Sequence, residues 1–197
     1  MNAMNTPERT ALAELAHKLA IEAGDKIMQF YRQGIAVQHK SDDSPVTEAD
    51  EAAEAIILAA LRTLTPDIPI VAEEEAASGK VVEVGDKPFW LVDPLDGTRE
   101  FSEPPRSDWA VHVALAEDGR PTAGAVDLPG LGLTLSTLEA NTTDDLAPVP
   151  GALRIVVSPT TPPDQHLAVA EAPRSVPVKS GYAGAQACPI IQDRGQP

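Results

Sequence analysis

Two short apolar segments of this 197-residue sequence each run directly into acidic side chains. The acidic residues are Glu73 and Glu74 after the first segment, and Asp93 and Asp96 after the second. Carboxylates that gather at the ends of strands repel one another unless a hard cation lies between them. Oxygen ligands of this kind suit Mg²⁺ and Ca²⁺ better than softer metals. The pattern therefore predicts a divalent-metal site built from two strand ends.

The second acidic pair belongs to the string Asp-Pro-Leu-Asp-Gly-Thr at residues 93–98. Pro94 favours an extended turn, so that the two aspartates can converge while the Leu95 carbonyl points the same way. Gly97 permits a tight bend with exposed backbone N–H groups, and a helix beginning at Thr98 would offer its N-terminus to a phosphate. A lone Asp-Gly is usually only a turn former. The whole string, after an apolar strand and with a second acidic strand end upstream, favours a functional site.

Amphipathic helices are predicted before the acidic strands. The first begins at Thr6 and Pro7, which are favoured at a helix start, and its apolar residues recur at helical spacing until Gly34. The second is predicted from about Thr47 to Leu64. The polar segment between the two helices has the composition of a loop. The helices therefore precede the strands that carry the acidic residues.

Short strands are predicted on either side of a polar linker at residues 140–150. Those before the linker are 68–72, 89–92, 109–115, 123–126 and 131–135, the last three as an antiparallel meander. Those after it are 153–158 and 176–179, with a helix at 163–172 between them. This order predicts an α/β fold of the layered α+β kind. Residues 1–140 would form an N-terminal α+β metal-binding part, and residues 151–197 a partial C-terminal α/β part.

The overall charge narrows the classes of partner. Asp and Glu outnumber Lys and Arg by 30 to 15, which gives a formal net charge of −15. This balance repels nucleic-acid polymers and anionic membranes, whereas a bound divalent cation still allows a small anionic substrate. A single cysteine, Cys188, cannot form an intrachain disulfide. The polar residues 1–9 do not resemble a signal peptide, and the longest apolar stretch, at 55–61, is too short to span a membrane. We therefore expect a cytoplasmic protein without a transmembrane segment.

Three segments resemble the inositol-monophosphatase superfamily. Residues 90–101, Trp-Leu-Val-Asp-Pro-Leu-Asp-Gly-Thr-Arg-Glu-Phe, resemble its first signature. Residues 40–50 are similar to its N-terminal loop and helix start, and residues 71–74 to its glutamate-bearing strand end. The ending Thr-Arg-Glu-Phe resembles the 3′(2′),5′-bisphosphate nucleotidase branch, also called PAP phosphatases, more than the inositol monophosphatases, which typically continue Thr-Thr-Asn-Phe. The resemblance implies a sugar-phosphatase-like α-β-α-β sandwich.

The same resemblance implies a role for each matching residue. Mg²⁺ would be held by Glu73, Asp93, Asp96 and the Leu95 carbonyl, with two or three ions in the intact family site. Asp50 and Thr98 would orient and deprotonate the attacking water, with support from Glu74. The amides of Gly97 and Thr98 would receive the scissile phosphate, and Lys40 is an additional candidate for contacting it, although a solvated loop lysine is an equally good interpretation.

The implied activity is hydrolysis of the 3′-phosphate of adenosine 3′,5′-bisphosphate to AMP and phosphate by a water that the metal activates. The alternatives are an inositol-1-monophosphatase or a fructose-1,6-bisphosphatase, which share the metal chemistry. Only Arg99, Glu100 and Phe101 separate these possibilities in the sequence. The partner is expected to be a small phosphorylated substrate, and family members often form homodimers.

The sequence departs from the family pattern near its end. It contains no Trp-Asp pair, whereas the second family signature has one and uses its Asp as a metal ligand. Residues 180–187 are similar to the stretch before that signature, with Tyr182 and Gln186 where Ser and Lys are expected. Asp193 is a weak candidate for the missing ligand. An incomplete C-terminal part is therefore expected, with at least one Mg²⁺ still bound, and a catalytically impaired metal-binding pseudoenzyme is the alternative of another class.

The four histidines lack the spacing of zinc ligands. They are His17, His39, His112 and His166. His112 lies between Ala110 and Ala114 on one face of a predicted strand, so it is interpreted as packed or half-exposed rather than as a general base.

Overall fold

The computed structural model describes residues 6–34, 38–39, 45–46, 48–138, 153–157 and 175–179. Contacts within the chain divide it into two units, Met1–Glu139 and Ala140–Pro197. The predicted linker at 140–150 lies outside the described residues.

Two long helices form one layer of the first unit. α1 extends over Thr6–Gln33 and α2 over Glu48–Leu64, and the two helices pack against each other. Both bury small and aliphatic side chains at helical spacing, which explains why these segments are helical. Gly34 follows α1 with a φ of 70°, a left-handed conformation that commonly ends a helix. Both predicted helices are confirmed.

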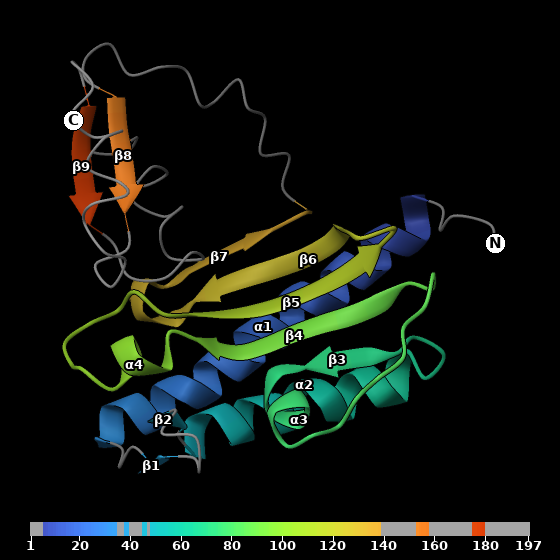
Figure 1. Ribbon diagram of the computed structural model, residues 1–197, viewed down its shortest axis with the longest axis horizontal. Coiled ribbons are helices and arrows are strands. Elements are labelled where there is room, and N and C mark those ends of the chain that lie inside the picture. Colours follow the sequence, from blue (N-terminus) through green and yellow to red (C-terminus); the bar gives the residue numbers. More distant parts are fainter. Residues whose placement is uncertain are drawn as a thin grey trace. The chain divides into compact units, whose positions relative to one another are not determined.

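A five-stranded sheet forms the second layer, in the order β3-β4-β5-β6-β7 (Figure 1). Its strands are β3 (Ile70–Ala72), β4 (Phe89–Asp96), β5 (Ala110–Glu117), β6 (Arg120–Leu128) and β7 (Leu133–Ser136). β3 runs parallel to β4, and every later neighbour is antiparallel. The predicted meander is therefore confirmed, and the layered α/β class with it.

The helices cover one face of this sheet (Figure 1). Alternate residues of β4 and β5 point toward them and are buried, among them Trp90, Val92 and Val113. Trp90 also donates its indole N–H to the hydroxyl of Thr65, 3.0 Å away, just beyond the end of α2. The opposite face carries the exposed side chain of Leu91 and the acidic residues at the end of β4.

Short elements lie between the long helices and between the strands of the sheet. They are β1 (Gln38–His39), β2 (Pro45–Val46), α3 (Glu73–Ala77), α4 (Thr98–Phe101) and the 3₁₀ turn η1 (Pro129–Leu131). β1 and β2 pair antiparallel around the segment that was predicted to be a loop. No helix of the described residues is both long and apolar enough to cross a membrane.

The second unit contains two described strands, β8 (Leu153–Val157) and β9 (Ser175–Lys179). They pair in parallel, with Leu153 opposite Ser175. The two strands predicted here are confirmed within a residue or so at their ends. The helix predicted at 163–172 lies outside the described residues.

One carboxyl group is buried where α1 crosses β6. Asp127 is 6% exposed and accepts a hydrogen bond of 2.7 Å from the Thr134 hydroxyl. A Cβ atom on Gly24 of α1 would overlap this carboxyl group, so only glycine fits there. Burial raises the pKa of Asp127 from 3.8 to about 6, although the hydrogen bond from Thr134 lowers it. The ionised carboxylate is therefore a cost to the folded state at neutral pH.

Replacing Asp127 by Asn should stabilise the protein at neutral pH. Because the pKa is raised in the folded state, the stabilising contribution of this group is present below pH 3.8 and is lost as the pH rises through about 6. Asn keeps an acceptor for Thr134 but carries no charge. We expect Asp127→Asn to gain about 1–3 kcal/mol over the parent chain at pH 8, and little at pH 4.

Urea unfolding at several pH values measures this difference directly. Asp67→Asn, which neutralises an exposed carboxylate, is the matched control and should show no such pH-dependent gain. An advantage of Asp127→Asn that stayed constant from pH 4 to pH 8 would contradict the account.

Candidate metal and active site

A bulge in β4 brings Asp93 and Asp96 onto the same face of the sheet. Asp93 lies opposite His112 of β5, and Asp96 lies opposite Ala110, so three steps along β4 match two steps along β5. In a regular strand, residues three apart point to opposite faces of the sheet. The extra residue of the bulge turns Asp96 to the face on which Asp93 lies. The expected turn at Pro94 is therefore wrong in one respect, because β4 continues through Pro94 to Asp96. The convergence of the two aspartates is achieved by the bulge.

The end of β3 supplies the next carboxylate. Ala72 lies beside Val92 in the parallel pair of β3 and β4, so Glu73 and Asp93 follow at neighbouring positions. Glu73 lies close enough to raise the pKa of Asp93, both through a hydrogen bond and through its charge. Because two ionised carboxylates at this separation repel each other, the pair favours a proton on one of its members.

The crowding of carboxyl groups shifts the pKa of Asp93. The pKa of Asp93 is raised to about 9, first by burial and then by the hydrogen bond and charge of Glu73 and the charge of Asp96. The backbone N–H of Leu95, which donates to the Asp93 carboxyl over 3.2 Å, acts in the opposite direction. The cluster therefore carries more negative charge than its surroundings can stabilise. A bound cation would take the place of the proton that the pair favours.

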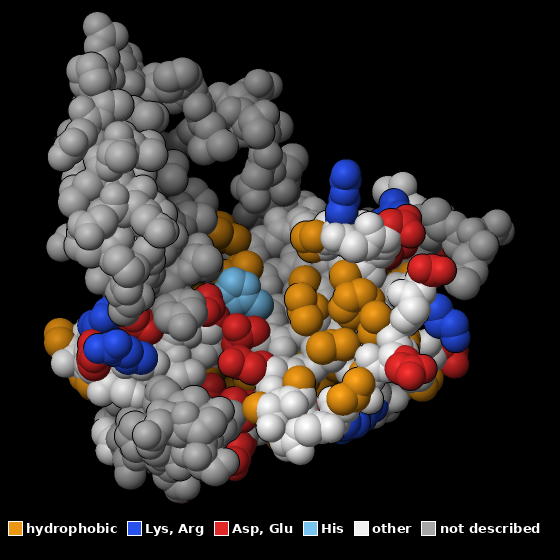
Figure 2. Space-filling model, viewed as in Figure 1, with side chains coloured by type: hydrophobic (Ala, Val, Ile, Leu, Met, Phe, Trp, Pro, Cys, Tyr) orange, Lys and Arg blue, Asp and Glu red, His pale blue; other side chains and the backbone are white. Residues whose placement is uncertain are grey.

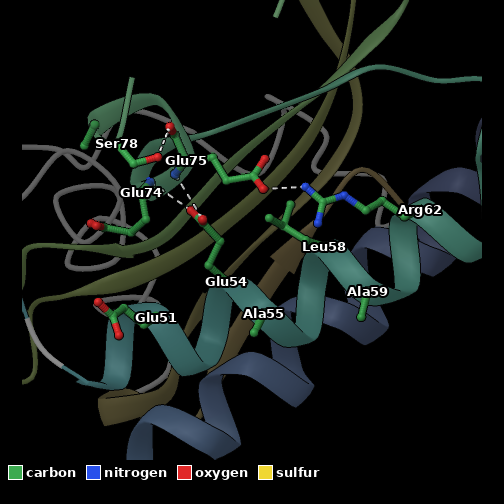
Figure 3. A pocket seen from close by; sticks show the side chains of 10 residues that line it. Glu51, Glu54, Ala55, Leu58, Ala59, Arg62, Glu74, Glu75 and Ser78 are labelled. Carbon is green, nitrogen blue, oxygen red and sulfur yellow. Dashed lines mark hydrogen bonds and ion pairs between the residues drawn. The ribbon is translucent and has the colours of Figure 1, made fainter. Parts of the chain in front are cut away.

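A buried glutamate of α2 fixes the corner between β3 and α3. Glu54 is 5% exposed and accepts hydrogen bonds from the backbone N–H groups of Glu74, at 2.9 Å, and Glu75, at 3.1 Å (Figure 3). Burial raises the pKa of Glu54, while the N–H of Glu74 lowers it. Glu54 acts as a cap for the first turn of α3 and so fixes the start of the helix where Glu73 lies.

A hollow of about 670 Å³ lies beside this corner, between α2 and α3 (Figure 3). Glu51, Glu54, Glu74 and Arg62 are among the side chains that line it, and Arg62 forms an ion pair with Glu75. The lining includes neither Asp93 nor Asp96. Glu74 therefore borders the hollow on the helical side, whereas the converging carboxylates lie on the sheet.

The bend after β4 requires glycine. Gly97 has a φ of 97°, and a Cβ there would lie 3.2 Å from the Cβ of Trp109. α4 then begins at Thr98, as predicted, although it is only four residues long. The Thr98 hydroxyl donates to the Leu95 carbonyl over 3.2 Å, which ties the start of α4 to the bulge.

Aromatic packing holds α4 in place. The rings of Tyr31, Phe101 and Trp109 lie 5.2 to 5.6 Å apart, centroid to centroid. The Tyr31 hydroxyl donates to the Arg106 carbonyl over 2.7 Å, and the Arg106 guanidinium lies 3.6 Å from the buried carboxylate of Glu100. The segment after the bulge is thus anchored to α1 through the ring and the hydroxyl of Tyr31.

The remaining candidates are placed as follows. Asp50 is 1% exposed in the first turn of α2, a helix that packs against β4. Its expected pairing with Thr98 remains a prediction, and Lys40 lies outside the described residues. Sequence reasoning missed Glu54, and it interpreted His112 as packed or half-exposed without a partner. The His112 side chain is 30% exposed, and its Nε2 lies 3.2 Å from Asp96 Oδ2. Acidic side chains gather beside a histidine on the face of the molecule drawn in Figure 2.

The donor set fits a hard divalent cation. It consists of three carboxylates and the Leu95 carbonyl, all oxygen donors of the kind that Mg²⁺ binds. In their present positions, no three His, Cys, Asp or Glu side chains of the described residues form a ready group of ligands.

Comparison with known proteins provides independent evidence on the family of this chain. A comparison with protein families matches residues 8–178 to the inositol monophosphatase family. The 3′(2′),5′-bisphosphate nucleotidase CysQ of Salmonella typhimurium is 46% identical over 122 residues, which cover 61% of this chain and 49% of that protein. A 3′-phosphoadenosine 5′-phosphate phosphatase of Mycobacterium bovis is 39% identical over 149 residues, covering 72% of this chain and 55% of that protein. The chain spans about half the length of these curated relatives.

The structural comparison agrees on the fold. An IMPase of Thermotoga maritima superimposes with a TM-score of 0.70 at 23% identity, covering 90% of this chain and 71% of that one. At this identity the likeness establishes a shared fold alone. Because the family match extends over most of the sequence, the chain belongs to the inositol monophosphatase family.

Replacing Asp93 by Asn should stabilise the metal-free protein at high pH. The pKa of Asp93 is raised from 3.8 to about 9 in the folded state, so its stabilising contribution is lost as the pH rises through about 9. Asn removes this titration and can still donate to Glu73. In chelator, we expect Asp93→Asn to be more stable than the parent chain at pH 8.5, by a margin that shrinks toward pH 5.

Denaturant unfolding at the two pH values provides the measurement, with Asp86→Asn as a control at an exposed carboxylate. If Asp93→Asn unfolded more easily than the parent chain at pH 8.5, Asp93 would not be the crowded group described above.

Proposed function

We propose that the chain acts as a Mg²⁺-dependent phosphomonoesterase, and that its substrate is adenosine 3′,5′-bisphosphate, from which it releases the 3′-phosphate to leave AMP. The observation that carries this proposal is the convergence of Glu73, Asp93 and Asp96 at the β4 bulge, where the half-buried Asp93 has a raised pKa. A phosphate ester is itself anionic, so it can approach such a cluster only where cations neutralise it.

The residues that would hold Mg²⁺ are Glu73, Asp93, Asp96 and the carbonyl of Leu95. When bound, Mg²⁺ draws charge from phosphate oxygens and lowers the pKa of water. At least one ion is expected here, and two or three in the intact family site.

The chain's own groups would orient the reactants. The Thr98 hydroxyl, which donates to the Leu95 carbonyl, keeps its oxygen as an acceptor for the attacking water. The buried carboxylate of Asp50 would take the proton of that water, with Glu74 as a neighbouring support. The backbone N–H groups of Gly97 and Thr98 would receive the phosphate, because the left-handed conformation of Gly97 turns the chain sharply at that point.

The choice of substrate rests on similarity. Two relatives at 39% and 46% identity carry the names of phosphatases that act on 3′-phosphorylated nucleotides. Residues 99–101, Arg-Glu-Phe, follow the metal string as in the bisphosphate nucleotidases. Inositol 1-phosphate and fructose 1,6-bisphosphate are the alternative substrates. We further propose a cytoplasmic location and a homodimer, as the family resemblance implies. The acidic composition disfavours a nucleic-acid polymer as partner.

A metal-binding protein without turnover is the alternative of another class. The sequence has no Trp-Asp pair, and the family resemblance assigns one metal ligand to that Asp. In this alternative Mg²⁺ binds at Glu73, Asp93 and Asp96, but phosphate release stays slow.

A panel of phosphate substrates, assayed with Mg²⁺ and with chelator, separates these possibilities. We expect release from adenosine 3′,5′-bisphosphate to exceed release from the other two substrates, to need Mg²⁺, and to be inhibited by Li⁺ and excess Ca²⁺. Asp93→Asn should lower the rate by on the order of 100-fold, because it removes a ligand at the reacting centre. Asp86→Asn, at an exposed position, should leave it unchanged.

Full activity after chelation would contradict the metal proposal. Mg²⁺ binding without phosphate release from any substrate of the panel would favour the pseudoenzyme.

A further inference from the structure

We propose that His112 is a positioning residue, which holds the Asp96 carboxylate in its ligating orientation by donating a hydrogen bond from Nε2. This inference rests on the proposed metal site and names a further residue on which that site depends.

The strand register places His112 at the centre of the acidic group. His112 lies directly opposite Asp93 in the β4–β5 pair, and Asp96 lies opposite Ala110, two residues away on the same face of β5. Without the bulge, Asp96 would point to the other face of the sheet, away from the imidazole. The same irregularity that gathers the two aspartates therefore also brings Asp96 to His112.

The imidazole has a polar neighbour on one side only. Nε2 lies 3.2 Å from Asp96 Oδ2, within the reach of a hydrogen bond. On the same face of the sheet, His112 is flanked by Ala110 and Ala114 along its strand, and Val126 of β6 lies opposite. None of these three side chains can accept a hydrogen bond.

The atom Nε2 is buried and, among the described residues, has no partner aligned for a hydrogen bond. A buried N–H that lacks a partner costs free energy, so a small rotation of Asp96 that completes the bond is favoured. The completed bond would use one oxygen of Asp96 and leave the other directed at the cation. A neutral imidazole protonated at Nε2 is sufficient for this.

Partners that orient ligating carboxylates strongly affect metal affinity. Their loss typically weakens metal binding by about 10- to 100-fold. A histidine that only fills space would instead change the stability of the fold and leave the affinity for metal unaltered. Metal affinity is therefore the readout that separates positioning from packing.

The test compares the whole chain with His112→Leu and His112→Gln by calorimetric titration of Mg²⁺. Leu removes the donor at similar volume, and Gln keeps an N–H donor at a similar distance from the backbone. We expect His112→Leu to raise the dissociation constant at least about 10-fold, and His112→Gln to stay within about threefold of the parent chain. Leu91→Gln, an exposed position on the same face of the sheet, is the control and should have no effect.

Urea unfolding of each variant shows whether it is folded, and His112→Gln supplies a second test if His112→Leu is not. Unchanged affinity in His112→Leu, or an equal loss in both variants, would overturn the positioning role while leaving the metal site intact. If the parent chain itself bound no Mg²⁺, the metal site of the proposed function would be wrong, and this inference would fall with it.

Discussion

Mutual repulsion among carboxylates at the end of β4 is the constraint on which the rest of this structure depends. Glu73, Asp93 and Asp96 come from two neighbouring strands, and the bulge directs both aspartates to one face. Without a cation, this crowding raises the pKa of Asp93 to about 9 and so favours a retained proton. Holding such groups together costs free energy, and the helical layer behind the sheet offsets that cost through apolar burial.

The surrounding contacts restrain the positions of these three carboxylates. Glu54 fixes the corner that carries Glu73, and the Thr98 hydroxyl ties the start of α4 to the bulge. The aromatic rings of Tyr31, Phe101 and Trp109 hold the following segment against α1. Ligands must be held in place before the ion arrives if binding is to be strong, because otherwise ordering them consumes part of the binding energy.

Local patterns in the sequence predicted most of the fold and which acidic residues lie together at the strand ends. Helical spacing gave α1 and α2, alternation gave the meander, and the acidic strand ends gave Glu73, Asp93 and Asp96. The continuation of β4 through Pro94 was not predictable, because proline normally interrupts a strand and a bulge depends on register with β5. The capping role of Glu54 was not predicted, because a single glutamate within a helix normally faces solvent. His112 was identified as a half-exposed strand residue, but its proximity to Asp96 follows only from the bulge.

We expect Mg²⁺ to replace the proton that the Glu73 and Asp93 pair favours in the absence of metal. Calorimetric titration of Mg²⁺ at pH 7.5, in two buffers with different ionisation enthalpies, counts the protons released on binding. The account predicts release of about one proton for each ion bound at this site, because a group with a pKa of about 9 must lose its proton to become a ligand. In Asp93→Asn this release should disappear. Tight binding of Mg²⁺ with no release of protons would contradict the account.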